Sequence, residues 1–329
     1  MLNNIRWGIL GTSFISEVMV KAIRESTNGH VVAVAGRTGQ KVDEFANTLG
    51  ITASYQNYQS LIDNPEIDAV YIGLPNYLHK EWIVNTARAG KHILSEKPFT
   101  ISVKEAQEVI EVVNECKVFC MEAIMYRCHP FIAELKKIVN ANLIGEIQFI
   151  EAGYTADIVD LANPNEGGAI RNLGCYPLSL IRYLMNSEPL DIQASGRINQ
   201  KTGSDAQSTA KFKFSNARHA TISTADDQEM AWKFEIHGDN GILKIVTNPW
   251  LPDKTNTIVI KHHAKEDSVE LNFTAEKSLY TYQIDLMNDC IMRNEWPHPA
   301  GVPLSESLAN THALEVWRRQ VCHGLKEFL

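Results

Sequence analysis

The chain has 329 residues, of which 44% are hydrophobic and 21% are charged, and its formal net charge is -8. This length suits two domains, and the composition is that of a globular protein. The negative charge argues against a general affinity for nucleic acid or anionic membrane, and no apolar stretch approaches the roughly 20 residues that a membrane helix needs.

The start of the chain and its cysteines predict a cytoplasmic protein. The opening MLNNIRWGIL enters a strand-like run without the basic and apolar regions of a signal peptide. The 6 cysteines form no C-x-x-C pair, so we expect reduced thiols. Neither the cysteines nor the histidines have the spacing of metal ligands, and we predict no metal site.

The first part of the chain alternates apolar runs with helical spacings. The runs at 5–10, 31–35, 69–72, 93–94 and 118–121 are separated by segments whose apolar residues recur at helical intervals. Strands that are apolar on both faces are typical of a parallel sheet covered by helices on both sides. We therefore predict an α/β, doubly wound, Rossmann-type dinucleotide-binding domain over residues 1–122, with its ligand beyond the carboxyl ends of the strands.

The first strand runs into GILGTSFIS, a degenerate glycine-rich turn. Gly8 and Gly11 match glycines that bring backbone N–H groups and a helix N-terminus to a pyrophosphate. Ser13 stands where a third glycine is usual, and we expect its hydroxyl to bond a phosphate oxygen or to cap the helix. The predicted cofactor contacts of this turn are Gly8, Gly11, Thr12, Ser13, Phe14 and Ile15.

The end of the second strand bears on the choice of cofactor. It carries Gly36-Arg37-Thr38 instead of the acidic residue that would bond the ribose 2′-hydroxyl of NAD. The planar guanidinium of Arg37, with Thr38 as a second donor, suits a 2′-phosphate. These residues predict NADP(H) over NAD(H). The alternative is that Arg37 stacks on the adenine ring, which either cofactor allows.

The second half of the chain changes character. From about residue 147 it shows short strand-like runs, several of them alternating, joined by links typical of hairpins. We predict an α+β domain over residues 123–329 with a mostly antiparallel, open sheet that binds substrate and forms a homodimer. A final helix is predicted at 305–325, and one possible arrangement is that this helix packs against the first domain.

A polar loop and a helix stand between the first strands of this half. The loop spans 157–168, and we expect it to be solvated, with closure of Asp157 and Asp160 over a polyol as the alternative. The stretch NLGCYPLSLIRYLM has the apolar spacing of a helix. Its first turn contains Tyr176 and Pro177, and proline is suited to that position.

Four segments together resemble the glucose–fructose oxidoreductase/inositol dehydrogenase (Gfo/Idh/MocA) family: GILGTSFIS, LPNYLH, SEKPF and GGAIRNLGCYP. The resemblance covers essentially the whole chain and implies a nicotinamide-dependent oxidoreductase. It implies that Lys97 of SEKPF projects between nicotinamide and substrate and that the following proline peptide is often cis. Glu96 and Lys97 are both predicted to contact the cofactor. It also implies that Leu74, Pro75 and Asn76 line the cofactor cleft.

Tyr176 stands where many members of this family carry a histidine. The tyrosine version resembles the branch of dimeric dihydrodiol dehydrogenase and glucose–fructose oxidoreductase, which favours NADP(H) as Arg37 does. The family usually has an aspartate four residues before this position, whereas this chain has Asn172. Asparagine can hold a substrate hydroxyl but cannot take its proton.

Lys97 and Tyr176 are the predicted catalytic residues. A free tyrosine has a pKa of about 10, and a neighbouring ammonium group favours the phenolate. We predict that both side chains meet at one substrate oxygen, where Tyr176 moves the proton and Lys97 polarises the carbonyl. Arg127 is expected to bind a substrate oxygen or to form an interdomain ion pair.

The predicted substrate is a sugar, a sugar-derived ketone or a cyclic diol, bound as a small carbohydrate-like molecule. Two alternatives stand beside this reaction. One is a regulatory protein of the same fold that senses nucleotide without catalysis. The other is a non-redox family member that retains NAD and cleaves a glycosidic bond.

Overall fold

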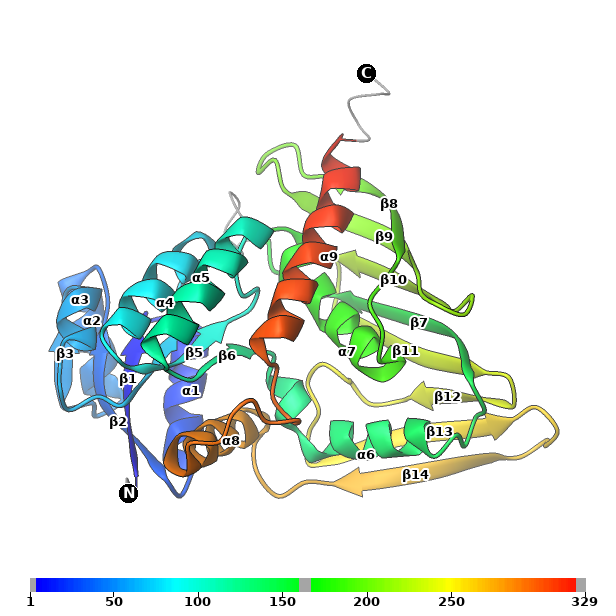
Figure 1. Ribbon diagram of the computed structural model, residues 1–329, viewed down its shortest axis with the longest axis horizontal. Helices are drawn as coiled ribbons and strands as arrows, with labels where there is room; N and C mark the ends of the chain where they lie inside the picture. The colour runs from blue at the N-terminus through cyan, green and yellow to red at the C-terminus, as the bar shows by residue number, and fades with distance from the viewer. Residues whose placement is uncertain (1–3, 160–166, 324–329) are drawn as a thin grey trace. The chain divides into compact units, whose positions relative to one another are not determined.

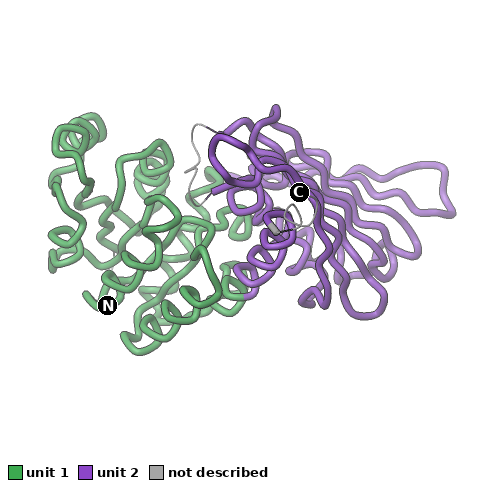
Figure 2. The backbone as a smooth tube through the Cα atoms, turned by 90° about the horizontal axis from the view of Figure 1, so that it is seen from above, with its two compact units in different colours: residues 1–129, 277–308 green, residues 130–276, 309–329 purple. Residues whose placement is uncertain are grey.

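The computed structural model describes residues 4–159 and 167–323. By its internal contacts the chain divides into two compact units, which Figure 2 shows in different colours. Unit 1 comprises residues 1–129 and 277–308, and unit 2 comprises residues 130–276 and 309–329. Each unit draws on two stretches of chain, whereas the predicted boundary after residue 122 divides the chain once. The assignment of separate functions to two domains stays a prediction.

Unit 1 is built on a parallel sheet with the strand order β3-β2-β1-β4-β5-β6. Its strands are β1 (Ile5–Leu10), β2 (Gly29–Ala35), β3 (Ala53–Tyr55), β4 (Ala69–Ile72), β5 (His92–Glu96) and β6 (Cys120–Ala123). The order reverses between β1 and β4, and ligands of doubly wound sheets bind at such a reversal. The predicted doubly wound fold is confirmed.

Helices cover both faces of this sheet (Figure 1). They are α1 (Phe14–Glu25), α2 (Gly39–Thr48), α3 (Tyr58–Ile62), α4 (His79–Arg88), α5 (Val103–Cys116) and α8 (Leu279–Arg293), with the short 3₁₀ turns η1 (Asn76–Leu78) and η2 (Met125–Cys128). Trp7 and Ile9 of β1 join a buried cluster with α1, α2 and α8, whereas Leu10 joins another with α3, α4 and α5. Two cores on one sheet explain why its strands are apolar on both faces.

Helix α8 was not predicted from the sequence. Its Asn288 accepts a hydrogen bond from the indole N–H of Trp7 at 3.0 Å and donates one to the hydroxyl of Ser26 at 3.0 Å. Asn288 and Gln283 are fully buried in this helix. Buried polar residues interrupt an apolar helical pattern, so the helix escapes detection by hydrophobic periodicity.

Unit 2 contains a sheet with the strand order β14-β13-β12-β11-β7-β10-β9-β8. Its strands are β7 (Ile147–Thr155), β8 (Asp191–Ile198), β9 (Asp205–Lys213), β10 (His219–Ala225), β11 (Ala231–Gly238), β12 (Gly241–Ile245), β13 (Thr255–His262) and β14 (Ser268–Thr274). Among the described strands of this sheet, β7 and β10 pair in parallel and the other neighbours are antiparallel. The mostly antiparallel sheet is confirmed, and β12, β13 and β14 extend it beyond the predicted strands.

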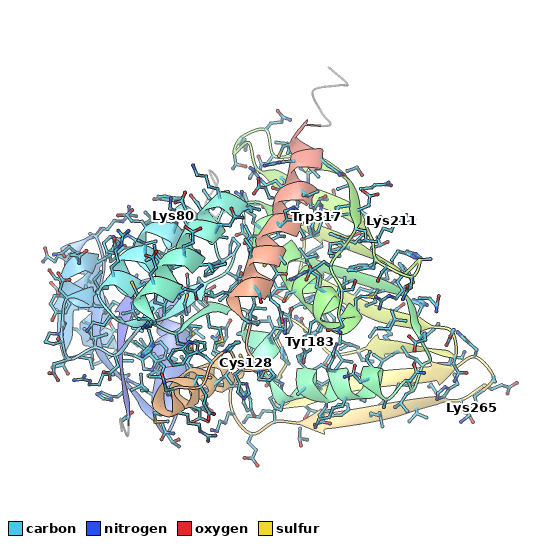
Figure 3. The ribbon with its side chains drawn as sticks, viewed as in Figure 1. Lys80, Cys128, Tyr183, Lys211, Lys265 and Trp317 are labelled. Carbon is cyan, nitrogen blue, oxygen red and sulfur yellow. The ribbon has the colours of Figure 1, made fainter. Side chains whose placement is uncertain are left out.

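One face of this sheet is covered by helices (Figure 1). They are α6 (Pro130–Asn140), the π-helical turn η3 (Ile170–Gly174), α7 (Cys175–Met185) and the part of α9 (Leu304–His323) that belongs to unit 2. Trp317 of α9, labelled in Figure 3, donates its indole N–H to the hydroxyl of Ser208 at 2.8 Å. Among the described residues no helix covers the opposite face, which is the predicted open face.

The predicted last helix, 305–325, is found as Leu304–His323. Residues 324 and 325 and the acidic Asp160 of the predicted loop lie outside the described residues. Within 4–159 and 167–323, no helix combines the length and the apolar character that crossing a membrane requires.

Candidate active site

The turn between β1 and α1 needs a glycine at position 11. Gly11 has a φ of +102°, and a Cβ atom there would lie 2.4 Å from the carbonyl oxygen of Gly73. Ser13 then caps α1, because its side chain accepts the backbone N–H of Ser16. This confirms the capping role expected of Ser13, and the first N–H groups of α1 face the end of the sheet.

Gly8 lies inside β1, before the turn. A Cβ atom on Gly8 would lie 2.6 Å from Leu61 Cδ2 and 2.9 Å from Ile67 Cδ1. The absence of a side chain therefore lets α3 and the chain after it pack closely against the sheet. The predicted contact of Gly8 with a cofactor stays a prediction.

A cavity of about 270 Å³ opens where β1, β2 and β4 end. Most of the predicted cofactor residues line it, together with three residues that were not predicted, Lys41, Tyr58 and Gly73. The predicted residues in the lining are Gly11, Thr12, Ser13, Gly36, Arg37, Thr38, Leu74 and Pro75. Of the other predicted residues, Phe14 is 80% exposed at the start of α1 and Asn76 begins η1. Four segments far apart in sequence, the turns after β1, β2 and β4 and the start of α3, thus line one cavity.

The lining of this cavity is cationic. Arg37 and Lys41 contribute positive charges, and none of the lining residues is acidic. Burial raises the pKa of the Tyr58 hydroxyl, and the guanidinium of Arg37 opposes that shift. A second cavity of about 420 Å³ shares Arg37 and Tyr58 and is bordered by Trp82. The rings of Tyr58 and Trp82 meet edge to face at 4.9 Å.

Lys97 follows the last residue of β5, in a turn that is held by the half-buried Glu96 and the buried Tyr71. Tyr71 donates to Oε1 of Glu96 at 2.8 Å, and the backbone N–H of Lys97 donates to Oε2 of Glu96 at 3.3 Å. Burial raises the pKa of the Glu96 carboxyl, and the Lys97 ammonium opposes the shift. The Lys97–Pro98 peptide is cis, as the family resemblance implied.

The far side of the same turn is held by Glu122, at the end of β6. Glu122 is buried, and its Oε1 accepts the backbone N–H of Phe99 at 2.9 Å. A buried N–H group without a partner would destabilise the fold, so Glu122 both satisfies this donor and fixes the turn. The lysine loop is therefore attached at Glu96 and at Phe99.

His79 connects the lysine loop to the loop after β4. The ring is fully buried, with Nδ1 2.8 Å from the carbonyl oxygen of Pro98 and Nε2 2.8 Å from that of Leu74. Only an imidazolium can donate to both carbonyls, whereas burial, the larger effect, lowers the pKa of His79 and favours the neutral ring. In either state the ring couples the cavity wall at Leu74 to the turn that carries Lys97.

Arg127 is buried in η2. Its Nη1 lies 2.8 Å from Oε2 of Glu306, and both residues belong to unit 1. The guanidinium thus takes part in an ion pair within that unit. Its predicted contact with a substrate oxygen stays a prediction.

In unit 2, Tyr176 lies in the first turn of α7 and is 8% exposed. Its ring meets that of Tyr154 edge to face at 5.8 Å. Burial raises the pKa of Tyr154 to about 12. Asn172 lies in the preceding π-helical turn, where its backbone N–H donates to the carbonyl oxygen of Gly168 at 3.0 Å. The predicted meeting of Tyr176 with Lys97, which belongs to unit 1, stays a prediction.

Several residues of these networks were missed by sequence reasoning. Lys41 stands one helical turn after Arg37 at the start of a helix, and this spacing was an available signal. Glu122 is a lone carboxylate in the apolar strand CMEA, which is a second signal. Tyr58 gave no signal, and His79 was quoted only as the last residue of LPNYLH, because the contacts of both residues depend on which loops the fold brings together.

The fold and the cavity define the class of this protein. A doubly wound parallel sheet with a glycine turn, a capped helix and a cationic cavity at its switch point is a dinucleotide-binding unit. Residues 5–124 match the family described as "Oxidoreductase family, NAD-binding Rossmann fold", and residues 132–244 match the "GFO/IDH/MocA C-terminal domain". The chain belongs to the Gfo/Idh/MocA oxidoreductase family, so the resemblance of its motifs is confirmed.

Named relatives agree with this assignment. The chain is 30% identical to an uncharacterized oxidoreductase, ORF334, of Rhizobium meliloti, covering 97% of this chain and 98% of that one. It is 28% identical to trans-1,2-dihydrobenzene-1,2-diol dehydrogenase of Xenopus tropicalis, covering 88% and 89%. The crystal structure of the 3-ketoreductase KijD10 from Actinomadura kijaniata, with NADP and TDP-benzene, has a TM-score of 0.89 at 23% identity and covers 97% of this chain and 98% of that one. This last likeness shows the shared fold.

A second buried carboxylate cluster lies in unit 2, at Asp205 and Asp226. Asp226 is 4% exposed, and among the described residues no donor reaches its Oδ1. Burial raises the pKa of Asp226 to about 6, and the charges of Asp205 and Asp227 add to the shift. The ionised form of Asp226 is therefore disfavoured in the folded protein.

This shift predicts a pH-dependent gain in stability from Asp226→Asn. The folded-state pKa lies above the value of 3.8 for an unperturbed carboxyl, so the folded state binds the proton more tightly than the unfolded state. Ionised Asp226 thus destabilises the fold above pH 6, and the penalty disappears as the pH falls toward 4. We expect Asp226→Asn to raise the free energy of unfolding at pH 7.5 by up to about 3 kcal/mol, because one pKa unit corresponds to about 1.4 kcal/mol.

Urea unfolding at several pH values measures this gain. The matched control is Asp227→Asn, at the neighbouring carboxylate that pairs with Arg197 and is partly exposed; it should change stability by no more than about 1 kcal/mol. A gain from Asp226→Asn that is the same at pH 4 and pH 7.5 would contradict the assigned ionisation.

Proposed function

We propose that this protein is an NADP(H)-dependent oxidoreductase that transfers a hydride between the nicotinamide and a carbonyl or hydroxyl carbon of a sugar, a sugar-derived ketone or a cyclic diol. The cavity at the ends of β1, β2 and β4 carries the proposal, because it joins the glycine turn to Arg37 and Lys41. Membership of an oxidoreductase family supports hydride transfer. The dihydrobenzenediol dehydrogenase relative supports a diol or a related compound.

Arg37, Thr38 and Lys41 would hold the 2′-phosphate of NADP(H). Two cations and a hydroxyl donor suit a phosphate group, and an acidic residue that would favour the free ribose of NAD is missing from this lining. The N-terminus of α1 would hold the pyrophosphate through its backbone N–H groups. The exposed ring of Phe14 stands at that N-terminus, where a bound dinucleotide would cover it.

Lys97 and Tyr176 would act on the substrate oxygen. When bound, the nicotinamide supplies or accepts the hydride. Tyr176 would donate the proton to the carbonyl oxygen in reduction and receive it in oxidation, while Lys97 polarises the same oxygen. Asn172 would hold a neighbouring hydroxyl. Glu96, His79 and Glu122 would keep the lysine loop in place, so that less of the lysine's freedom is lost when substrate binds.

The remaining parts of the proposal concern location and partners. Cysteines without paired spacing support a cytoplasmic enzyme, and the net charge of -8 supports one that does not bind nucleic acid. A homodimer through the open face of the unit 2 sheet is supported by the charges of that face. Lys233, Lys244 and Lys261 lie there on neighbouring strands with Glu151, Glu235 and Glu270. Within the chain Lys233 pairs with Glu151 at 2.7 Å and Lys244 lies 3.5 Å from Glu235, and a second copy related by a twofold axis would offer each charge a further partner of opposite sign.

Replacing Tyr176 by Phe tests the catalytic proposal. We expect kcat with NADPH and a responsive carbonyl substrate to fall about 100- to 10,000-fold, because the proton donor is lost. The dissociation constant of NADPH should stay within about 2-fold, because Tyr176 lies outside the nucleotide cavity. Absorbance at the nicotinamide band and NADPH fluorescence measure the two quantities.

The matched control is Tyr154→Phe, which removes the hydroxyl of the neighbouring buried ring and should leave kcat within about 3-fold. Unchanged turnover in Tyr176→Phe would remove the tyrosine from the mechanism. A wild-type enzyme that oxidises or reduces nothing in a panel of sugars, sugar ketones and cyclic diols would refute the proposed function itself.

Removing the cations of the cavity tests the choice of cofactor. Arg37→Ala and Lys41→Ala should each raise the KM for NADPH about 10- to 100-fold, because a charge-assisted hydrogen bond contributes about 1.5–3 kcal/mol. The KM for NADH should change less than about 3-fold. Lys21→Ala is the control, because Lys21 pairs with Glu17 on the exposed side of α1. Equal losses with both cofactors would contradict a role in recognising the 2′-phosphate.

Thr221→Arg tests the proposed dimer. Thr221 is partly exposed and lies on the open face of β10 between His219 and Ser223, so a long charged side chain there should separate two copies. Sedimentation should show a dimer for the wild type and mostly monomer for the variant. Lys265→Glu, in the loop between β13 and β14 (Figure 3), should leave the dimer intact. A wild-type monomer would refute the dimer.

A further inference from the structure

The helix that carries Asn172 and Tyr176 begins without a side-chain cap of its own. It starts as the π-helical turn Ile170–Gly174 and continues as α7, and the residue before it is Ala169. Alanine has no side-chain acceptor for the first N–H groups of a helix. A buried helix start therefore needs a partner from elsewhere in the fold.

Asp205, at the start of β9, supplies that partner. It is fully buried, and its Oδ2 accepts the backbone N–H of Ile170 at 2.7 Å. The chain passes so close to this carboxylate that a Cβ atom on Gly168, where φ is +106°, would lie 2.4 Å from Oδ1. Thr224 of β10 braces the same turn by donating to the carbonyl oxygen of Ala169 at 3.3 Å.

Helix α9 supports this carboxylate from the other side. The Nε of Arg318 lies 3.3 Å from Oδ1 of Asp205. The adjacent residue, Trp317, packs against the end of the π-helical turn, because a Cβ atom on Gly174 would lie 3.0 Å from its ring. A buried charge without such a partner is unfavourable, so Arg318 helps Asp205 to remain a carboxylate at this place.

We propose that Asp205 is a positioning residue that fixes the turn Gly168–Gly174 and thereby sets where Asn172 and Tyr176 lie, with Arg318 holding its carboxylate. The role in turnover rests on the proposed function. The π-helical turn is consistent with this role, because such turns occur often at functional sites. A displacement of about 1 Å at a reacting group can lower a rate about 100-fold, so a contact one turn away from Tyr176 matters for catalysis.

The test compares Asp205→Ala with Asp205→Asn in the full-length protein. Asparagine keeps an oxygen that can accept the Ile170 N–H, whereas alanine removes it. We expect Asp205→Ala to lower kcat about 100-fold and Asp205→Asn to stay within about 10-fold of the wild type. The dissociation constant of NADPH should stay within about 2-fold in both. Hydrogen exchange of the amides at 168–176 should become faster in Asp205→Ala and much less so in Asp205→Asn.

Asp227→Asn is the matched control and should change neither kcat nor exchange at 168–176. If Asp205→Ala keeps kcat within about 3-fold, the positioning role is wrong. If both variants lose kcat equally and also lose their thermal transition and NADPH binding, the residue is only structural and the inference fails. If the wild type shows no turnover, the proposed function fails first. Hydrogen exchange then decides, and an unchanged rate at 168–176 in Asp205→Ala overturns the inference.

Discussion

Buried carboxylates hold backbone N–H groups in both segments that carry the proposed catalytic residues. Glu122 accepts the N–H of Phe99 at 2.9 Å, next to the turn of Lys97, and Asp205 accepts the N–H of Ile170 at 2.7 Å, before the helix of Tyr176. A hydrogen bond to a charged group contributes about 1.5–3 kcal/mol, whereas a buried carboxylate without a partner is strongly unfavourable. Burial of each carboxylate is therefore favourable only when its loop adopts the conformation that donates this N–H group. The carboxylate in turn stabilises that loop conformation.

Hydrogen bonds to buried groups also explain how the short loops after β4 and β5 are held in one conformation. The loops after β4 and β5 are anchored by Leu74 and Phe99, which are buried in one hydrophobic cluster, and polar contacts at His79 and Glu96 add to this anchoring. These contacts are made by residues of strands and helices that pack against a hydrophobic cluster on each face of the sheet. Because such packed interiors deform little, the loops that they hold are also kept in one position. Loops that are held by both buried apolar side chains and polar contacts can keep reacting groups in place.

The sequence predicted the parts of this arrangement that depend on local pattern. The alternation of β-branched runs with helical spacings is set by neighbouring residues, and it located the parallel sheet, the capped turn at Ser13 and the position of Arg37. The contacts of Glu122 and Asp205 join residues 23 and 35 positions apart, and no local pattern encodes such a distance. The fold must first bring the strand ends together.

The elements missed in the second half have equally physical causes. Helix α8 buries Gln283 and Asn288 to pair with the first unit's β1 and α1 region, and these polar residues break the apolar periodicity. Strand β14 forms an edge of its sheet, and its residues are exposed or half-buried. Its side chains therefore resemble those of a loop, and only pairing with β13 makes it a strand.

The charge that lines the cavity has the opposite sign to the net charge of the chain. The chain carries a net charge of -8, yet the cavity at the ends of β1, β2 and β4 is lined by two cations and, among the described residues, by no acidic one. Glu96 and Glu122 of unit 1 and Asp205 of unit 2 each accept a hydrogen bond from an N–H or O–H group of their own unit. These three carboxylates are held by backbone and hydroxyl donors, while Arg37 and Lys41 line the cavity. The local potential that an anionic ligand meets is set by this placement of side chains, and the sign of the total charge does not determine it.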